Sequence, residues 1–205
     1  MAETATSNSK TPQLDREEQI LDIAASLIQT RGFNGFSYQD IADAMAIRKA
    51  SIHYYFPSKA GLGLAAMNRY ATRIDTALAE LEADETLSAR AMIERYCEAL
   101  VQIARSSDNF CLAGALAAEL MVLPDDIRRL VDQFFQRQQA WLARTIERGL
   151  ANGEIQSSLS SGQLARLVFS AAEGALLIKR TSGDLQQMLD VVYALKQHLF
   201  GVEDE

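Results

Sequence analysis

The chemically most suggestive part of this 205-residue sequence is a run of hydroxyl, aromatic and basic side chains within residues 37–59. If residues 49–56 form a helix, Ile52 and Phe56 share one face and pack inward. The outward face is then small, hydroxylic and aromatic: Ala50, Ser51, His53 and Tyr54. A purely solvated face is normally rich in glutamate and lysine. This composition instead suits contact with base edges and phosphates of DNA.

The charge distribution allows such a contact although the total charge does not suggest it. The chain has 20 basic and 27 acidic residues and a formal net charge of −7. No acidic residue occurs between Asp43 and Asp75, and that window holds Arg48, Lys49, Lys59, Arg69 and Arg73. This is compatible with a local phosphate-binding surface and equally with chance clustering on a solvated helix.

Cys111 is a second residue that could do chemistry. It follows Asp108, Asn109 and Phe110, which favour a helix start, and free N–H groups in a first turn lower the pKa of a thiol. We therefore consider Cys111 as a sensor of oxidants or electrophiles. The alternative is a small buried apolar residue, which is the expected role of Cys97. Two cysteines form neither a disulfide framework nor a four-ligand zinc site, so no metal and no cofactor is expected.

Two acids lie within otherwise apolar helical stretches and are candidates for orienting a ligand. They are Glu119 and Glu173, and either could instead sit at a helix edge or pair with arginine. Aromatic side chains that could line the same pocket are Phe110, Phe134, Trp141 and Phe169. Aromatic residues at helical spacing are equally compatible with plain core packing.

The elements that must position these groups are all helical. Apolar spacing and capping residues predict an all-α chain of about nine helices, in residues 15–31, 37–45, 49–56, 58–82, 89–105, 111–123, 124–152, 161–180 and 184–200. Ser37-x-x-Asp40 predicts a capping-box-like start for the second helix, and Pro57 ends the third. Two short helices behind a longer one form a helix-turn-helix unit. We expect a disordered tail in residues 1–13, a helix-turn-helix DNA-binding domain in 14–57 and a larger sensing and dimerisation domain in 58–205.

The last two expected helices have broad apolar faces. Small residues such as Ala171 and Gly174 would let another helix approach closely. These helices predict a homodimer that forms a four-helix bundle. The alternative is that they only close the core of one monomer.

Several motifs in their order and spacing resemble the DNA-binding domain of TetR-type regulators. The resemblance covers about 45 residues, 20–64, and its motifs are Ile20-Leu21-Asp22-x-Ala24, Gly32-Phe33, Ser37-x-x-Asp40-Ile41-Ala42 and Ala50-Ser51-Ile52-His53-Tyr54-Tyr55-Phe56-Pro57-Ser58-Lys59. It implies a homodimer whose fourth helix joins the DNA-binding domain to a variable ligand-binding core. A small molecule in that core would change the separation of the two DNA-binding domains and release the operator.

The resemblance also implies roles for single residues. Phosphate contacts are expected at Ser37, Tyr38 and Lys59, base contacts at Lys49, Ala50 and Ser51, and the aromatic positions are His53, Tyr54 and Tyr55. Ala46 stands where the family usually has glycine, and His53 replaces a more frequent tyrosine. The segment from Phe110-Cys111-Leu112 to Ala118-Glu119 is similar to the cysteine-bearing helix of TetR-type repressors that sense electrophiles.

The expected function is that of a repressor that binds near-palindromic double-stranded operator DNA and is released by a small molecule or an electrophile. The alternative is an architectural or partner-directed DNA-binding factor without ligand control. An enzyme is not expected, because the chain has only two histidines and lacks a phosphate-cradling glycine loop, His-Glu-x-x-His and Gly-x-Ser-x-Gly. A polar N-terminus and an apolar run of only residues 111–123 predict a cytoplasmic protein without a membrane partner.

Overall fold

The computed structural model describes residues 12–105 and 110–201. Within these two ranges the chain forms nine α-helices, one short 3-10 helix and no strand. The helices are α1 (Pro12–Arg31), α2 (Tyr38–Met45), α3 (Lys49–Tyr55), α4 (Lys59–Ala83), α5 (Ala89–Arg105), α6 (Leu112–Ala117), η1 (Leu120–Val122), α7 (Asp125–Ala151), α8 (Ser161–Ser182) and α9 (Gln186–Phe200). None of these described helices is long and apolar enough to cross a lipid bilayer. The expected all-α fold is confirmed.

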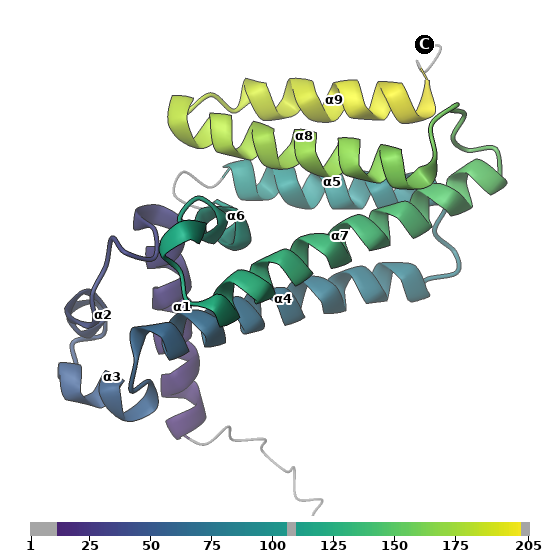
Figure 1. Cartoon of the computed structure of the whole chain (residues 1–205). Coiled ribbons are helices and arrows are strands. Elements are labelled where there is room, and N and C mark those ends of the chain that lie inside the picture. The colour runs from purple at the N-terminus through teal and green to yellow at the C-terminus, as the bar shows by residue number, and fades with distance from the viewer. Residues whose placement is uncertain (1–11, 106–109, 202–205) are drawn as a thin grey trace, which may run out of the picture.

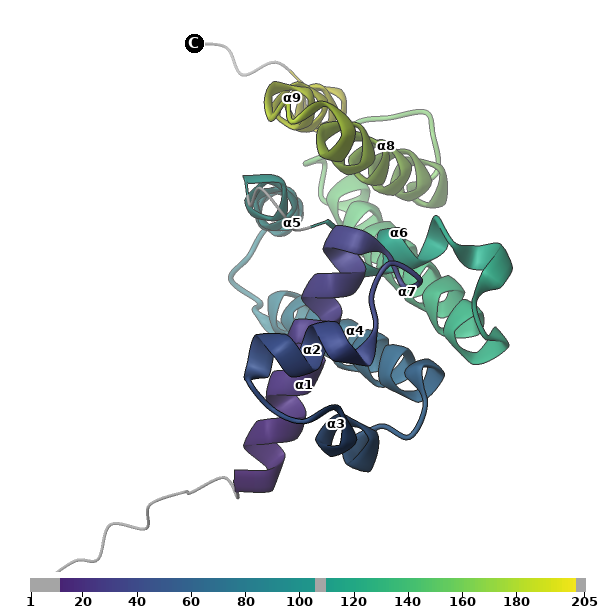
Figure 2. The ribbon, with the colours of Figure 1, turned by 90° about the vertical axis from the view of Figure 1, so that its left-hand side faces the viewer.

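Helices α1, α2 and α3 form a small unit at one corner of the molecule (Figures 1 and 2). Its core consists of aliphatic side chains with no exposed surface, among them Ile20 and Ile28 of α1, Ile41 of α2 and Ile52 of α3. Because α2 and α3 are too short to be stable alone, this shared core holds them at a fixed angle. The helix-turn-helix arrangement expected from the sequence is therefore present.

The turn between α2 and α3 depends on an unusual backbone conformation at Ala46. Ala46 has φ of 53° and ψ of 42°, and its N–H donates to the carbonyl oxygens of Ala42 and Asp43. It is the only non-glycine residue in the described chain with a positive φ. The left-handed region is unfavourable for a residue with a Cβ, so this turn retains the strain that glycine would avoid.

Replacing Ala46 with glycine is expected to stabilise the protein by about 0.5–1 kcal/mol. Removing the Cβ relieves about 1–2 kcal/mol of left-handed strain, and the greater freedom of unfolded glycine offsets part of it. The side chain is exposed, so no packing is lost. Urea unfolding measures the change. The control is Ala79→Gly, the same substitution at an exposed site within α4, which should lower the free energy of unfolding by about 1 kcal/mol. If both variants lose the same free energy of unfolding, Ala46 is not strained.

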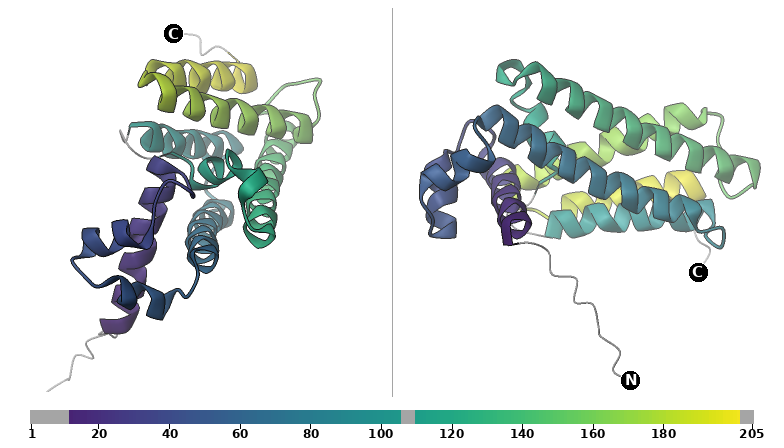
Figure 3. Two further views of the ribbon diagram at one scale, coloured as in Figure 1. Left: turned by 60° about the vertical axis from the view of Figure 1, so that its left-hand side comes forward. Right: turned by 90° about the horizontal axis from the view of Figure 1, so that it is seen from below.

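The larger half of the molecule is organised around α4 and α7, which lie side by side (Figure 3). Two ion pairs connect them, with 2.8 Å between Arg137 Nε and Asp75 Oδ2 and 2.8 Å between Arg144 Nε and Glu82 Oε1. Both pairs join residues 62 apart, so the two helices run parallel in fixed register. Helix α4 starts beside α3 and continues without a break into this larger half.

Helices α8 and α9 form the layer farthest from α3 (Figures 1 and 2). Their inner side is buried against the rest of the chain at Leu164, Val168, Leu176, Met188 and Leu195. Their outer side retains large apolar side chains in solvent: Leu167, Leu177, Ile178 and Tyr193. The two helices thus close the core of the monomer and also leave an apolar face uncovered.

Two boundaries differ from the sequence-based expectation. The expected disordered tail 1–13 is wrong at Pro12 and Gln13, which belong to α1, and its residues 1–11 lie outside the described residues. The expected helix 111–123 is wrong in its second part, because α6 ends at Ala117 and only the short η1 follows. Pro124 restricts the preceding Leu123 to an extended conformation, with ψ of 148°, which ends the helical path before α7.

Candidate nucleic-acid interface and ligand cavity

The outward face of α3 is free to contact another molecule. Lys49, Ala50, His53 and Tyr54 are exposed, and Tyr54 retains 72% of its accessible surface. Ser51 and Tyr55 are half-buried, and the Tyr55 ring meets the Tyr54 ring edge to face at 5.2 Å. The helix lies on the outside of the molecule, beside the start of α4 and away from α5–α9 (Figure 2). Its shape and composition suit insertion into a major groove.

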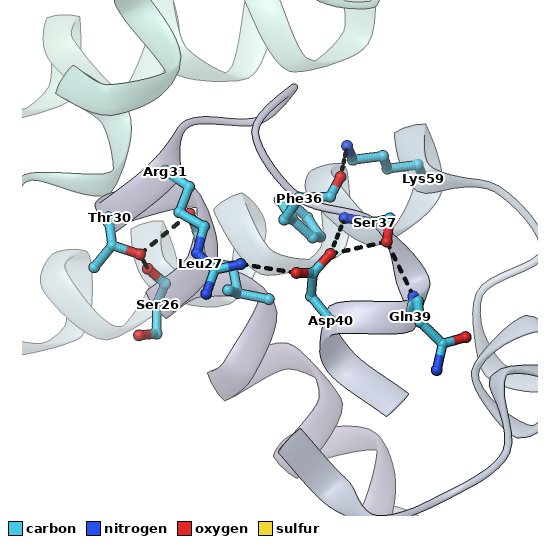
Figure 4. A network of polar contacts seen from close by, with 9 residues as sticks. All are labelled: Ser26, Leu27, Thr30, Arg31, Phe36, Ser37, Gln39, Asp40 and Lys59. Atoms are coloured by element: carbon cyan, nitrogen blue, oxygen red, sulfur yellow. Dashed lines mark hydrogen bonds and ion pairs between the residues drawn. The ribbon is translucent and has the colours of Figure 1, made fainter. Parts of the chain in front are cut away.

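A polar network at the start of α2 fixes the orientation of this unit (Figure 4). The Asp40 carboxylate accepts hydrogen bonds of 2.8 Å from Ser37 N, from Ser37 Oγ and from Arg31 Nη1. Ser37 Oγ accepts from the N–H of Gln39, which completes the expected capping box. The hydrogen bond from Ser37 N–H is the largest of the effects that lower the pKa of Asp40. The exposed Ser37 hydroxyl hydrogen is thus committed to Asp40.

Tyr38 does not have the position expected of a phosphate contact. Its side chain is buried, its hydroxyl donates to the Phe56 carbonyl oxygen at 2.8 Å, and its ring lies 4.6 Å from that of His53. Burial also raises the pKa of this phenol. Tyr38 therefore ties the start of α2 to the end of α3, and the predicted surface contact is wrong because the neighbouring helix covers the side chain.

Lys59 is likewise engaged within the protein. Its ammonium group donates to the Phe36 carbonyl oxygen and stands 4.3 Å from the centre of the Phe36 ring and 5.2 Å from that of Phe33. Figure 4 shows it reaching back over the segment that precedes α2. Burial lowers the pKa of Lys59, and the charges of Glu119 and Asp40 act in the opposite direction. In this geometry Lys59 holds a loop in place and its charge is not free to bind a phosphate. The exposed Lys49 does offer a free cation.

Glu119 joins the two halves of the molecule. One of its carboxylate oxygens accepts from Phe33 N at 2.6 Å, and the other accepts from Asn34 N at 3.0 Å and from Asn34 Nδ2 at 2.6 Å. Gly32, with φ of 82°, leaves room for this carboxylate, since a Cβ there would collide with it. Glu119 faces the unit formed by α1–α3 and, contrary to the expectation of a pocket residue, does not line the cavity described next.

A cavity of about 110 Å³ lies between α4, α5, α7 and α8, and its walls are mostly apolar. Four of the residues proposed from the sequence contribute to it: Cys111, Phe134, Phe169 and Glu173. Aliphatic side chains of α4 and α5 form its other walls: Ile74, Leu78, Leu81, Leu100 and Ile103. Polar groups that the sequence did not single out also line it: Tyr70, Arg95, Tyr96 and Gln138.

Phe110 and Trp141 do not line this cavity, contrary to expectation. The Phe110 carbonyl accepts from Gln29 Nε2 at 2.6 Å, and the Arg180 guanidinium lies 5.2 Å from its ring centre. Trp141 stacks on Tyr96 at 5.6 Å and donates to the Leu78 carbonyl oxygen at 3.1 Å. Both rings are buried core residues: Phe110 precedes the first turn of α6, and Trp141 of α7 packs between Tyr96 and the Leu78 carbonyl.

The polar end of the cavity surrounds Cys111, the N-cap residue of α6. Gly114 N donates to Cys111 Sγ at 3.4 Å, and the Tyr70 hydroxyl lies 3.8 Å from the same sulfur. The expected helix start is present, but the expected fall in thiol pKa is wrong. Burial, and next the charge of Glu173, raise the pKa of Cys111 far above its ordinary value and outweigh the Gly114 hydrogen bond. Cys97 is buried as expected, and burial raises its pKa to about 11.

Two family models match the chain one after the other. Residues 20–66 match the model described as "Bacterial regulatory proteins, tetR family", and residues 89–195 match "Tetracyclin repressor-like, C-terminal domain". The chain belongs to the TetR family. In this TetR-family transcriptional regulator, α1–α3 are the helix-turn-helix DNA-binding part, and α5–α8 with the first ten residues of α9 fall in the second matched region.

Named relatives of the TetR-family chain are repressors and regulators. It is 24% identical over 179 residues to the repressor DhaR of Mycobacterium sp. (strain GP1), covering 86% of this chain and 89% of DhaR. It is 24% identical over 190 residues to the repressor NemR of Escherichia coli (strain K12), covering 92% and 96%. The structure of a TetR transcriptional regulator from Legionella pneumophila superposes with a TM-score of 0.81 at 34% identity, covering 94% of this chain and all of that one.

Proposed function

We propose that this TetR-family regulator is a homodimeric repressor that binds near-palindromic double-stranded operator DNA through α3 and releases it when a small molecule or an electrophile enters the cavity. The observation that carries this proposal is the course of α4. Its first residue follows the turn after α3, and its residues Tyr70, Ile74, Leu78 and Leu81 line the cavity. One continuous helix therefore belongs to both candidate sites, so a ligand that shifts α4 also shifts the DNA-binding unit.

The outer face of α8 and α9 supports a homodimer. Leu177 and Ile178 are about half exposed, and Tyr193 of α9 retains 64% of its surface. A Cβ built at Gly174 meets nothing within 4 Å, so the middle of this face is open to another helix. Two copies joined here by a two-fold axis would present two α3 helices to successive major grooves of a near-palindromic site.

The cavity also favours ligand control over the alternative of an architectural or partner-directed DNA-binding factor. Such a factor has no use for an apolar cavity with a few convergent polar groups inside its larger half. That combination is the usual form of a small-molecule site. Within it, Cys111 and Glu173 are the proposed sensing residues, together with the Phe134 and Phe169 rings.

Replacing Lys49 with alanine tests the DNA-binding proposal. Lys49 is an exposed cation at the first position of α3, where it can neutralise one phosphate. We expect Lys49→Ala to weaken binding by the same factor for two duplexes, the protein's own upstream intergenic DNA and a scrambled sequence. The slope of log K against log salt should become shallower by about 0.9. Fluorescence anisotropy at several salt concentrations measures both quantities. Lys49→Arg keeps the charge and should keep the slope; an unchanged slope in Lys49→Ala would rule out this contact.

A further inference from the structure

Three groups from different elements meet at the polar end of the cavity. Tyr70 comes from α4, Cys111 from the start of α6 and Glu173 from α8, and all three line the cavity. The Tyr70 hydroxyl lies 3.8 Å from Cys111 Sγ, and the Glu173 carboxyl group is close enough to the thiol for each group to shift the pKa of the other. Glu173 Oε2 packs over the first turn of α6, 3.0 Å from where a Cβ of Gly114 would be. The glycine lets the carboxyl group approach the thiol.

A thiol in this position needs help to react. Burial raises the pKa of Cys111 and keeps it in the neutral form, which is a weak nucleophile. Such a thiol becomes reactive when an adjacent base takes its proton as the new bond forms. Glu173 supplies the carboxyl group that lines the cavity together with Cys111. Burial raises the pKa of Glu173 as well, which moves it toward the range in which a general base is most effective.

We propose that Glu173 is the general base for the addition of Cys111 to a small α,β-unsaturated carbonyl compound bound in the cavity. The inference rests on the proposed role of this cavity as the sensing site. The Glu173 carboxylate accepts the thiol proton while Sγ bonds to the β-carbon, and the π electrons of the C=C bond move to the carbonyl oxygen. The proton then passes from Glu173 to the α-carbon. The product is a thioether, all atoms of both reactants are retained, and no further reactant is required.

The cavity selects this class of compound by size and polarity. Its volume of about 110 Å³ suits a guest of about the size of benzene. Leu78, Leu100 and Phe134 offer apolar contacts that suit an uncharged ligand. Tyr70 and Tyr96, whose pKa values burial raises well above the ordinary value, remain neutral phenols that can donate to the developing enolate oxygen.

The test compares the wild-type protein and Glu173→Gln, both as full chains, in their reaction with 2-cyclohexen-1-one at pH 7. Intact-mass spectrometry follows the rate, and peptide mapping separates Cys111 from Cys97, which is not among the residues lining the cavity. We expect alkylation of Cys111 to slow by about 10²-fold or more in the variant, because general bases contribute about 10²–10⁴-fold. If Glu173 acts only through its charge, its removal lowers the pKa of Cys111 and alkylation becomes faster. An equal or faster rate in the variant therefore overturns the proposal.

The pH dependence of the wild-type rate decides the matter even if Glu173→Gln fails to fold. The titratable or charged groups that face the thiol and Glu173 across the cavity are Tyr70, Tyr96 and Arg95. With Glu173 as the base, the rate rises as its carboxyl group ionises and then levels off at a pH well below the pKa of Cys111. A tenfold rise per pH unit throughout the neutral range would mean reaction through free thiolate alone and would refute the role of Glu173. Operator binding without the enone is measured separately. A protein that reacts as expected but binds no DNA would contradict the proposed repressor function and leave this inference intact.

Discussion

Replacing Glu119 with alanine is expected to detach the DNA-binding unit from the larger half and to lower the free energy of unfolding by about 2–3 kcal/mol. The carboxylate accepts three hydrogen bonds from Phe33 and Asn34, and bonds to a charged acceptor contribute about 1.5–3 kcal/mol each. The total is smaller than their sum, because Asn34 is exposed and water replaces part of what is lost. Urea unfolding measures the loss, and hydrogen exchange of the Phe33 and Asn34 amides shows whether their contact with residue 119 has opened.

A control variant that removes one of the three hydrogen bonds separates the role of the Glu119 carboxylate from a general effect on folding. Asn34→Ala removes only the side-chain donor and leaves both backbone bonds to Glu119. It should lower stability by about 1 kcal/mol, the typical contribution of a single hydrogen bond. If Glu119→Ala is no more destabilising than Asn34→Ala, the carboxylate does not hold the two halves together.

Replacing Leu177 with arginine is expected to convert the proposed dimer into a monomer and to weaken operator binding at least 10²-fold. Leu177 is 51% exposed, beside Ile178 and one turn from the open surface at Gly174. Two-fold symmetry would place two such arginines in the centre of the interface, where unpaired buried charges are strongly unfavourable. Loss of the second half-site removes the avidity of a bivalent contact, which commonly amounts to about 10²–10⁴-fold.

Light scattering after size exclusion and fluorescence anisotropy on operator DNA measure these two effects. Met121→Arg is the matched control, because Met121 is an apolar residue with 89% exposure on η1, outside α8 and α9. It should remain dimeric and bind DNA as the wild type does. A Leu177→Arg protein that stays dimeric would place the interface elsewhere.

The helices were predictable because their signals are local. Apolar residues three or four apart, the Ser37–Asp40 capping box and Pro57 lie within a few residues of the elements that they define. The positive φ of Ala46 was indicated only by the resemblance, which places glycine at this position. Only the helix expected in residues 111–123 was broken, at the point where Glu119 makes contacts with residues 85 and 86 positions away.

The site residues were predicted less well, because their roles depend on distant parts of the chain. Tyr38 and Lys59 have side chains suited to phosphate, yet Phe56 and Phe36, 18 and 23 residues away, engage both. The position of Cys111 at a helix start was predicted, but the sign of its pKa shift is set by burial under α4 and α8. Tyr70 and Tyr96 were missed because a tyrosine on an apolar stripe looks like any core residue until folding brings α4 and α5 together.

The parallel register of α4 and α7 makes one side of the cavity stiff. The ion pairs of Asp75 with Arg137 and of Glu82 with Arg144, and between them the bond from Trp141 to the Leu78 carbonyl, fasten the two helices at successive turns. Sliding or separating them would break all of these contacts together. A ligand too large for the cavity therefore presses chiefly on the other walls, which α5 and α8 form. Any displacement of α4 and α7 at the cavity is then transmitted, because the two helices move together as a rigid body, to the first turn of α4, beside α3.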